Sequence, residues 1–137
     1  MQYPLKLAVI IFTTLLLVIP ATRPAEDRNY VEVSLISLIA NPEKFDGEYV
    51  LIKGVAYLDH HYSLYAVYLT REDKRAANDK NAIYLILAPS LGKVDQLNDK
   101  YVMTRGLFSA RDKGQSGSFS GSLAEVDLIR SIKLDIK

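Results

Sequence analysis

The chain of 137 residues contains no cysteine. Disulfide bonds, thiolate nucleophiles and sulfur-ligated metal sites are therefore excluded. A domain without disulfide bonds has to be held together by its apolar core. About 115 residues follow the apolar N-terminal segment, and a chain of that size, rich in Val, Leu, Ile and Tyr, can bury such a core.

An excess of either charge is also lacking. The whole chain has 17 basic and 16 acidic residues, a net charge of +1. Removal of residues 1–21 would take away Lys6 and leave the two signs balanced. Proteins that bind nucleic acid gain affinity by neutralising phosphates, which usually appears as a basic excess. The balance favours a protein, peptide or cell-envelope glycan as partner. The alternatives are a protein that binds single-stranded nucleic acid and a structural or accessory envelope protein without a small ligand.

Motifs of common catalytic sites are missing as well. The sequence has no G-x-S-x-G and no H-E-x-x-H, and its acidic residues are scattered through predicted loops and helix ends. We therefore predict a non-enzymatic protein without a cofactor. His60 and His61 are the only histidines, and Asp59 is their only nearby acidic residue, so no third ligand completes a metal site. We expect instead a surface turn that changes charge at about pH 6.

The N-terminal residues 1–21 have the features of a signal peptide. Lys6 precedes an apolar run from Leu7 to Ile19, and Ala21 supplies a small residue for cleavage. The run is shorter than the roughly 20 residues that span a bilayer, which disfavours the alternative of an uncleaved anchor. We predict a periplasmic or secreted protein. Residues 22–32 are polar and predict a mobile lead-in, and residues 33–137 form the predicted domain.

The remaining residues predict one short helix followed by five strands. Apolar residues at helical spacing follow the N-cap candidate Ser34, and Pro42 ends the helix. The predicted strands have apolar, β-branched and tyrosine-rich segments, and two long ones contain a central glycine, Gly54 or Gly106, which is typical of a curled sheet. These strands are residues 48–58, 64–70, 82–88, 100–110 and 122–134. Five strands of this kind favour a closed or nearly closed barrel, because closure removes exposed edges.

Two segments carry a resemblance to a known family. Residues 41–54, NPEKFDGEYVLIKG, and residues 99–106, DKYVMTRG, resemble the NPxKYxGKxVxVxG and GKYVxVxG patterns of bacterial OB-fold domains of the tRNA-anti-like kind. Residues 80–85, KNAIYL, and 113–121, KGQSGSFSG, are similar to segments of small exported OB-fold proteins. The resemblance covers most of residues 33–130. It implies a five-stranded OB-type barrel with an N-terminal helix.

The resemblance also implies where a ligand would bind. OB folds usually bind ligands on the face of the second and third strands, between the loops that join strands 1–2 and 4–5. Here those loops would be Asp59–Ser63 and Arg111–Gly117. The helix usual between strands 3 and 4 is reduced to Leu91–Leu97, which leaves open which end of the barrel is covered.

Nine tyrosines and no tryptophan make tyrosine the candidate stacking residue. Tyr65 and Tyr68 are three residues apart, so a regular strand points them to opposite faces. The alternative is that tyrosine occurs here mainly as a good strand former. The charged residues 71–75 predict a solvated loop or a recognition loop for a charged partner. The candidate ligand-binding residues are Tyr57, His60, His61, Tyr62, Tyr65, Tyr68, Arg71, Tyr84, Arg105, Arg111 and Lys113.

Overall fold

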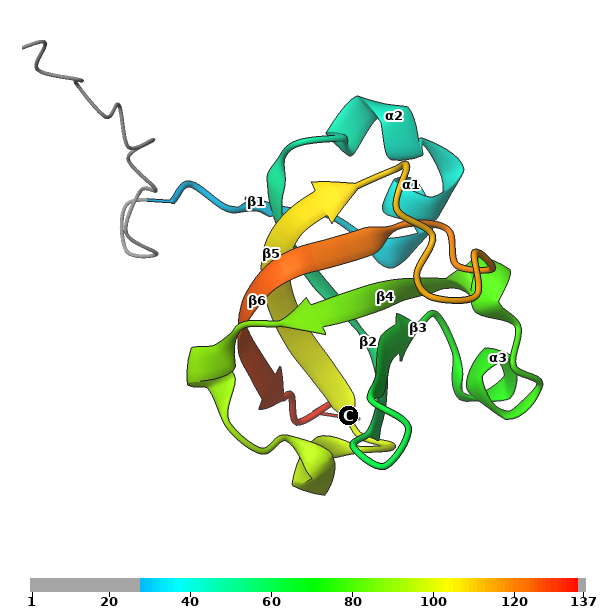
Figure 1. Ribbon diagram of the computed structural model, residues 1–137, viewed down its shortest axis with the longest axis vertical. Coiled ribbons are helices and arrows are strands. Elements are labelled where there is room, and N and C mark those ends of the chain that lie inside the picture. Colours follow the sequence, from blue (N-terminus) through cyan, green and yellow to red (C-terminus); the bar gives the residue numbers. More distant parts are fainter. Residues whose placement is uncertain (1–27, 136–137) are drawn as a thin grey trace, which may run out of the picture.

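A computed structural model describes residues 28–135; the predicted signal peptide and residues 22–27 of the predicted lead-in lie outside this range. Within it the fold is mainly β (Figure 1). The strands are β1 (Val31–Glu32), β2 (Tyr49–Asp59), β3 (Leu64–Tyr68), β4 (Ala82–Leu87), β5 (Tyr101–Ser109) and β6 (Ser122–Ser131). The α-helices are α1 (Leu35–Ala40), α2 (Pro42–Phe45) and α3 (Arg71–Arg75).

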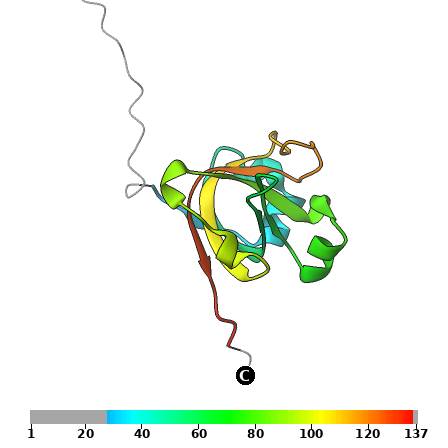
Figure 2. The same ribbon diagram turned by 60° about the horizontal axis from the view of Figure 1, so that its bottom comes forward.

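The strands form one mixed sheet with a closed ring of hydrogen bonds. Its order is β1-β2-β3-β4-β6-β5, and a further pairing of β2 with β5 closes the ring, as the end-on view in Figure 2 shows. β4 pairs with β6 in parallel, β1 pairs with β2 in parallel, and the other pairs are antiparallel. The sequence predicted five strands. The structure has a sixth in its described residues, because β1 pairs with Val50 and Leu51 near the start of β2.

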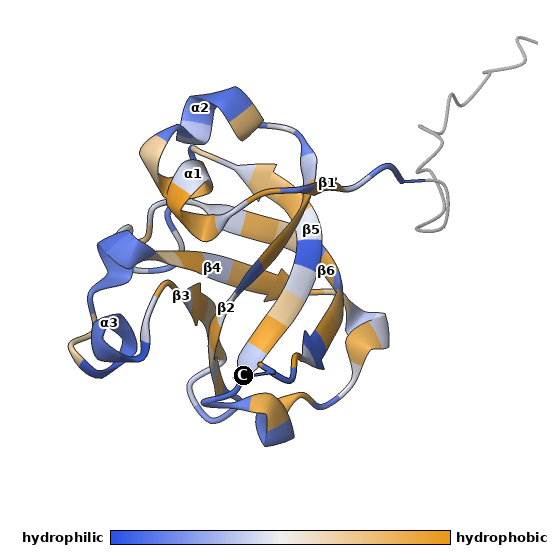
Figure 3. Ribbon diagram, turned by 180° about the vertical axis from the view of Figure 1, so that it is seen from behind, coloured by the Kyte–Doolittle hydropathy of each residue, from blue (hydrophilic) through white to orange (hydrophobic). Residues whose placement is uncertain are grey.

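Alternation of buried and half-buried side chains, interrupted in β2 only at Val55, explains why β2 and β5 are strands. In β2, Val50 and Ile52 are fully buried while Leu51 and Lys53 are only half-buried, and β5 alternates in the same way. Figure 3 shows the resulting mixture of apolar and polar residues along the strands. Gly54 lets β2 cross close to β3, since a Cβ there would lie 2.4 Å from Cγ1 of Val67. Gly106 is crowded in the same way, since a Cβ there would lie 2.5 Å from the Ala124 carbonyl oxygen, so both central glycines lie where the sheet brings neighbouring strands close together.

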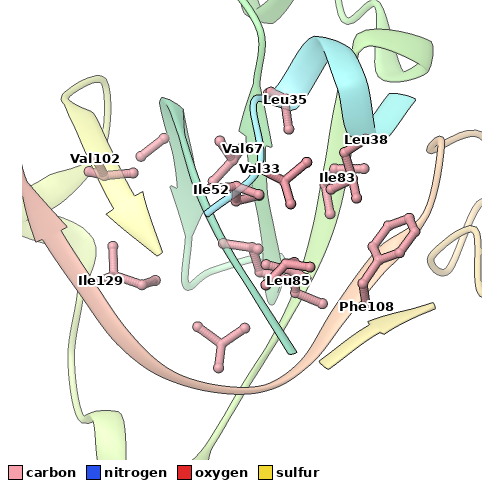
Figure 4. Close-up of a cluster of buried hydrophobic side chains, with 14 of the residues drawn as sticks. Val33, Leu35, Leu38, Ile52, Val67, Ile83, Leu85, Val102, Phe108 and Ile129 are labelled. Carbon is pink, nitrogen blue, oxygen red and sulfur yellow. The ribbon is translucent and has the colours of Figure 1, made fainter. Parts of the chain in front are cut away.

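The inward-facing side chains fill the ring. Phe108, Ile52, Ile83 and Leu85 are almost completely buried. Figure 4 shows these residues together with side chains from helix α1 in one cluster. Burying a side chain of this size contributes roughly 1.5–3 kcal/mol, so this cluster is the main source of stability.

Both ends of the ring are covered. At one end Leu35 and Leu38 of α1 are buried in the core, and Ser34 caps the helix by accepting a hydrogen bond from the Ser37 amide at 3.1 Å. At the other end, residues 89–97 form two short 3₁₀ turns around the buried Val94. Figure 1 shows these two caps at opposite ends. The sequence left open which end of the barrel is covered, and the structure has a small cap at each end.

Residues 28–32, predicted as the end of a mobile lead-in, lie against the sheet. The guanidinium of Arg28 lies 4.8 Å from the ring centroid of Tyr49, and that of Arg105 lies 4.5 Å from the ring centroid of Tyr30. Such cation–π contacts contribute about 0.5–2 kcal/mol each. They attach this segment to β2 and β5 next to the short strand β1.

Candidate functional site

The outer face of β2, β3 and β4 carries a second apolar cluster. The register pairs Tyr57 with Ala66 and Ala66 with Tyr84, so all three point outward. Tyr68 lies on the same face, and Phe119 from the β5–β6 loop joins the cluster. Tyr65 instead packs against the inner core, as the spacing from Tyr68 predicted. This outer face is where the resemblance implied a ligand.

The β5–β6 loop, residues 110–121, covers much of this face and is drawn in orange in Figure 1. The Phe119 ring lies 5.5 Å from the Tyr84 ring, and both side chains are buried. Gly114 has a φ of +74°, and a Cβ there would lie 2.8 Å from Phe119 and 3.0 Å from Tyr84. Glycine allows both the left-handed conformation and the close approach. Tyr84 is therefore part of the packing beneath the loop and is closed to a stacking ligand.

Asp79 attaches the β5–β6 loop to the β3–β4 connection. The Tyr68 hydroxyl donates to Oδ1 of Asp79 at 2.6 Å, and the Ser118 hydroxyl donates to Oδ2 at 2.7 Å. Burial raises the pKa of Tyr68 far above its ordinary value, and the hydrogen bond to Asp79 adds to this. The Tyr68 phenol is thus a fixed hydrogen-bond donor at neutral pH. One carboxylate holds two loops over the outer face.

A groove remains open beside this attachment, which we call the outer groove. It has a volume of about 450 Å³ and is lined by Tyr62, Leu64, Asp79, Gln115, Ser116 and Phe119. The Tyr62 side chain is 71% exposed and comes from the β2–β3 turn. Its lining combines apolar and aromatic surface with a carboxylate, an amide and a hydroxyl, the mixture that small-molecule sites usually show.

The β2–β3 turn is fixed by Asp59. Its Oδ1 accepts a hydrogen bond from the Tyr62 amide at 3.1 Å, while Oδ2 accepts one from the Tyr57 hydroxyl at 3.4 Å. Ser63 has a left-handed φ of +50°, which completes the reversal. The His61 ring contacts the Tyr62 ring edge-on at 4.7 Å. Tyr62 is therefore exposed on a turn whose backbone is held in place.

The histidines have separate environments. Nδ1 of His60 lies 2.9 Å from the Tyr65 hydroxyl, at the end of the ring next to residues 89–95. His61 is exposed in the turn. Among residues 28–135 no group of three or more His, Cys, Asp or Glu side chains could hold a metal ion.

The predicted basic residues are not gathered at the outer groove. Arg105 makes a bidentate salt bridge to Asp127, with N–O distances of 2.7 and 3.1 Å. Lys113 donates a hydrogen bond to the Ser120 carbonyl at 3.0 Å. Arg71 lies at a different hollow, and Arg111 is exposed at the start of the β5–β6 loop. Of the eleven candidates, only Tyr62 lines the outer groove.

The remaining residues that line the outer groove were not predicted from the sequence, because only the tertiary structure brings them together. Gln115 and Ser116 fall within the predicted loop Arg111–Gly117, but neither was singled out. Asp79 lies beyond the charged residues 71–75, and Phe119 lies beyond the predicted loop Arg111–Gly117. The signal that could have found Phe119 is a lone large aromatic residue in a Gly/Ser-rich segment, which is typical of a loop anchored to a surface.

No family model and no curated protein match the chain. A crystal structure of a DUF3299 family protein from Pseudomonas aeruginosa PAO1 is similar with a TM-score of 0.48 and 9% sequence identity. The match covers 67% of this chain and 66% of that one.

No helix within residues 28–135 is long and apolar enough to cross a membrane.

Proposed function

We propose that the protein is an exported, non-enzymatic binding module of the OB type whose outer groove takes a cell-envelope glycan. The strand order around the ring, with its parallel β4–β6 pair, supports the OB assignment. So does the position of the groove between the β2–β3 turn and the β5–β6 loop, the two loops that flank the usual ligand face of this fold.

One observation carries the choice of ligand: an exposed tyrosine ring stands beside a carboxylate and an amide in a groove that no Lys or Arg lines. A sugar ring offers C–H groups that pack on an aromatic face and hydroxyls that pair with carboxylate and amide groups. A phosphate backbone would instead meet the Asp79 carboxylate without a compensating cation. The groove therefore favours an uncharged polar ligand.

The groove also suits a short peptide less well than a sugar. A peptide that adds to a sheet needs a free strand edge. Here β3 is paired on both sides over Ala66 to Tyr68, which leaves only Leu64 and Tyr65 of this strand with a free edge. Side-chain contacts would have to hold most of a peptide, whereas a sugar uses both kinds of surface that the groove offers.

The test is titration of the full-length protein with neutral oligosaccharides, followed by amide chemical shifts. We expect saturable shifts at residues 59–64 and 113–119. Tyr62→Ala should weaken binding about tenfold, as loss of an aromatic anchor usually does. Ile36→Ala is the matched control, because Ile36 is 63% exposed but lies on α1.

The possible outcomes test separately whether the outer groove is a binding site and whether its ligand is a glycan. If a peptide pool or a single-stranded oligonucleotide shifts these same residues and no sugar does, the site stands and the glycan assignment is wrong. If no ligand class shifts them, or if Ile36→Ala weakens binding as much as Tyr62→Ala, the groove is not a binding site.

A further inference from the structure

A second hollow lies at α3, apart from the outer groove. It has a volume of about 320 Å³ and is lined by Arg71, Lys74, Arg75 and Asp99. The lining is thus three cations against one carboxylate, whereas the outer groove has no cation in its lining. The two sites share no lining residue, so they are independent.

The backbone that carries the three cations is held in place. Thr70 caps α3 by accepting from the Asp73 amide at 3.0 Å, and the Asp73 carboxylate accepts the side-chain amides of Asn78 and Asn81 at 2.9 and 3.0 Å. These contacts fix the short helix and the turn that follows it. Residues 71, 74 and 75 are therefore presented on one side of a helical turn, at spacings of three and four.

The positive charge of Lys74 is balanced by a carboxylate, and several contacts hold its side chain in place. Its ammonium pairs with the Asp99 carboxylate and donates to Oδ1 of Asn98 at 3.2 Å. It also lies 5.2 Å from the Tyr57 ring centroid, and its side chain is only 11% exposed. Asp99 itself has a left-handed φ of +65°. The one carboxylate in the hollow is thus already occupied by Lys74.

Neither Arg71 nor Arg75 forms an ion pair with a carboxylate of residues 28–135. Arg71 donates through Nη1 to the Asp99 carbonyl at 2.7 Å, which is a neutral acceptor. Arg75 makes no hydrogen bond or ion pair with any of residues 28–135. Like charges four residues apart on a helix destabilise it by a few tenths of a kcal/mol. The fold therefore holds two uncompensated guanidinium groups on one side of a hollow.

We propose that this hollow binds a phosphate group. Guanidinium groups present planar pairs of N–H donors that match the oxygens of a phosphate, and such charge-assisted bonds are about twice as strong as neutral ones. Arg71 and Arg75 supply the donors, and Lys74, held by Asp99, adds positive potential at the side of the site. A phosphate bound between Arg71 and Arg75 would accept hydrogen bonds from both guanidinium groups and offset their mutual repulsion.

The site goes beyond the proposed glycan function. It adds an anchor for a phosphorylated ligand at the opposite end of the β3–β4 connection from Asp79. A phosphate bound here can be detected whether or not the outer groove binds a sugar. Failure of one proposal therefore leaves the other standing.

The test uses inorganic phosphate and the full-length protein. The arginine Nε–Hε signals and the amides of residues 70–76 are followed by NMR during titration with phosphate and, in parallel, with sodium chloride at equal ionic strength. We expect saturable shifts with phosphate alone. Arg71→Gln and Arg75→Gln should each weaken binding about fivefold or more, since each removes a charge-assisted contact.

Two further variants separate binding from general charge. Arg130→Gln removes an exposed guanidinium elsewhere, on β6, and should change the affinity less than about twofold. Arg75→Lys should bind more weakly than the wild type but better than Arg75→Gln, because lysine keeps the charge and loses the planar pair of donors.

Stability gives an independent readout. The double variant Arg71→Gln, Arg75→Gln loses the hydrogen bond from Arg71 to the Asp99 carbonyl as well as the repulsion between the two arginines, so the melting temperature of each protein is compared with its own phosphate-free value. Phosphate should raise the melting temperature of the wild type and not that of the double variant. Equal shifts with chloride and phosphate, or an equal loss in Arg130→Gln, would overturn the proposal.

Discussion

At the scale of single residues, Asp73 shows how one carboxylate organises a charged segment. Its oxygens accept hydrogen bonds from Thr70, Asn78 and Asn81. These contacts, led by that with Thr70, lower the pKa of Asp73 below its ordinary value. The residues that look most like solvated loop in the sequence are therefore held by a small polar network.

The lowered pKa gives a prediction with a definite sign. Folding favours the ionised form of Asp73, so its contribution is present above the ordinary aspartate pKa, about 4, and is lost as the pH falls through the folded value. Asp73→Asn should therefore lower the melting temperature at pH 7, and the difference from the wild type should shrink as the pH falls toward 2. Asp95→Asn, at an exposed aspartate in another turn, is the matched control and should leave the melting temperature at pH 7 unchanged. A difference that stays constant across this range would show that the carboxylate charge is not what holds the turn.

At the scale of elements, the β5–β6 loop is attached to the sheet mainly by one ring. Phe119 is 2% exposed and contacts Tyr84, while its neighbours in the loop are largely polar. The loop therefore depends on Phe119 for most of its apolar contact, whereas its polar contacts are shared among Asp79, Asp46 and the backbone of residues 80 and 82.

Removal of this ring should loosen the loop without opening the ring of strands. Phe119→Ala should lower the free energy of unfolding by about 3 kcal/mol, the low end for truncation of a buried Phe. Ile86→Ala, at a position on β4 that is 42% exposed, should cost much less. Hydrogen exchange should show lost protection at residues 113–119 and retained protection in β2 and β5. Unchanged protection of the loop would mean that its polar contacts suffice to hold it.

Elements were predictable from the sequence wherever the signal is local. The five long strands lie within a few residues of their predicted bounds, because alternating apolar residues and tyrosines identify them. Helix α3 was missed, since a five-residue charged segment has no apolar periodicity and is stabilised by Thr70 and Asp73. Strand β1 was missed because cation–π contacts from Arg28 and Arg105 hold its neighbourhood, and no local pattern reports them.

The candidate site was predictable only in part for the same reason. Tyr62 belongs to a recognisable turn and remains exposed. Tyr68 and Tyr84 have the same strand-type sequence context, yet the β5–β6 loop buries them. Whether an outward tyrosine is free or covered depends on a loop that is distant in the sequence, and composition alone does not predict where that loop folds.

At the scale of the whole molecule, closure of the ring depends on two crossings with no room for a side chain. A Cβ at Gly54 would lie 2.7 Å from the Tyr68 carbonyl oxygen, and one at Gly106 would lie 2.5 Å from the Ala124 carbonyl oxygen. Backbone atoms cannot move aside at either point without shifting a neighbouring strand. Each glycine therefore permits one bend in the closed sheet.

Valine at either glycine should damage the whole fold. We expect Gly54→Val and Gly106→Val each to lower the free energy of unfolding by about 3 kcal/mol or more, beyond the usual cost of overpacking because backbone is displaced. The loss should appear as one cooperative shift, with tyrosine fluorescence and far-UV circular dichroism giving the same transition. Gly92→Ala tests a glycine with φ of +72° and nothing within 4 Å of its Cβ, and should cost only the local backbone strain. Undiminished thermal stability in both valine variants would contradict a curled, closed sheet.

The double role of Asp79 has a consequence for how this molecule can diversify. Its two oxygens already hold Tyr68 and Ser118, so any change there would alter the ligand contact and release the loops together. The Tyr62 hydroxyl, in contrast, bonds to no described residue. Among relatives that keep this groove, we expect position 79 to stay fixed while position 62 varies with the ligand. The ligand preference would then change through residue 62 in the β2–β3 turn, while the carboxylate at position 79 would keep the two loops in place.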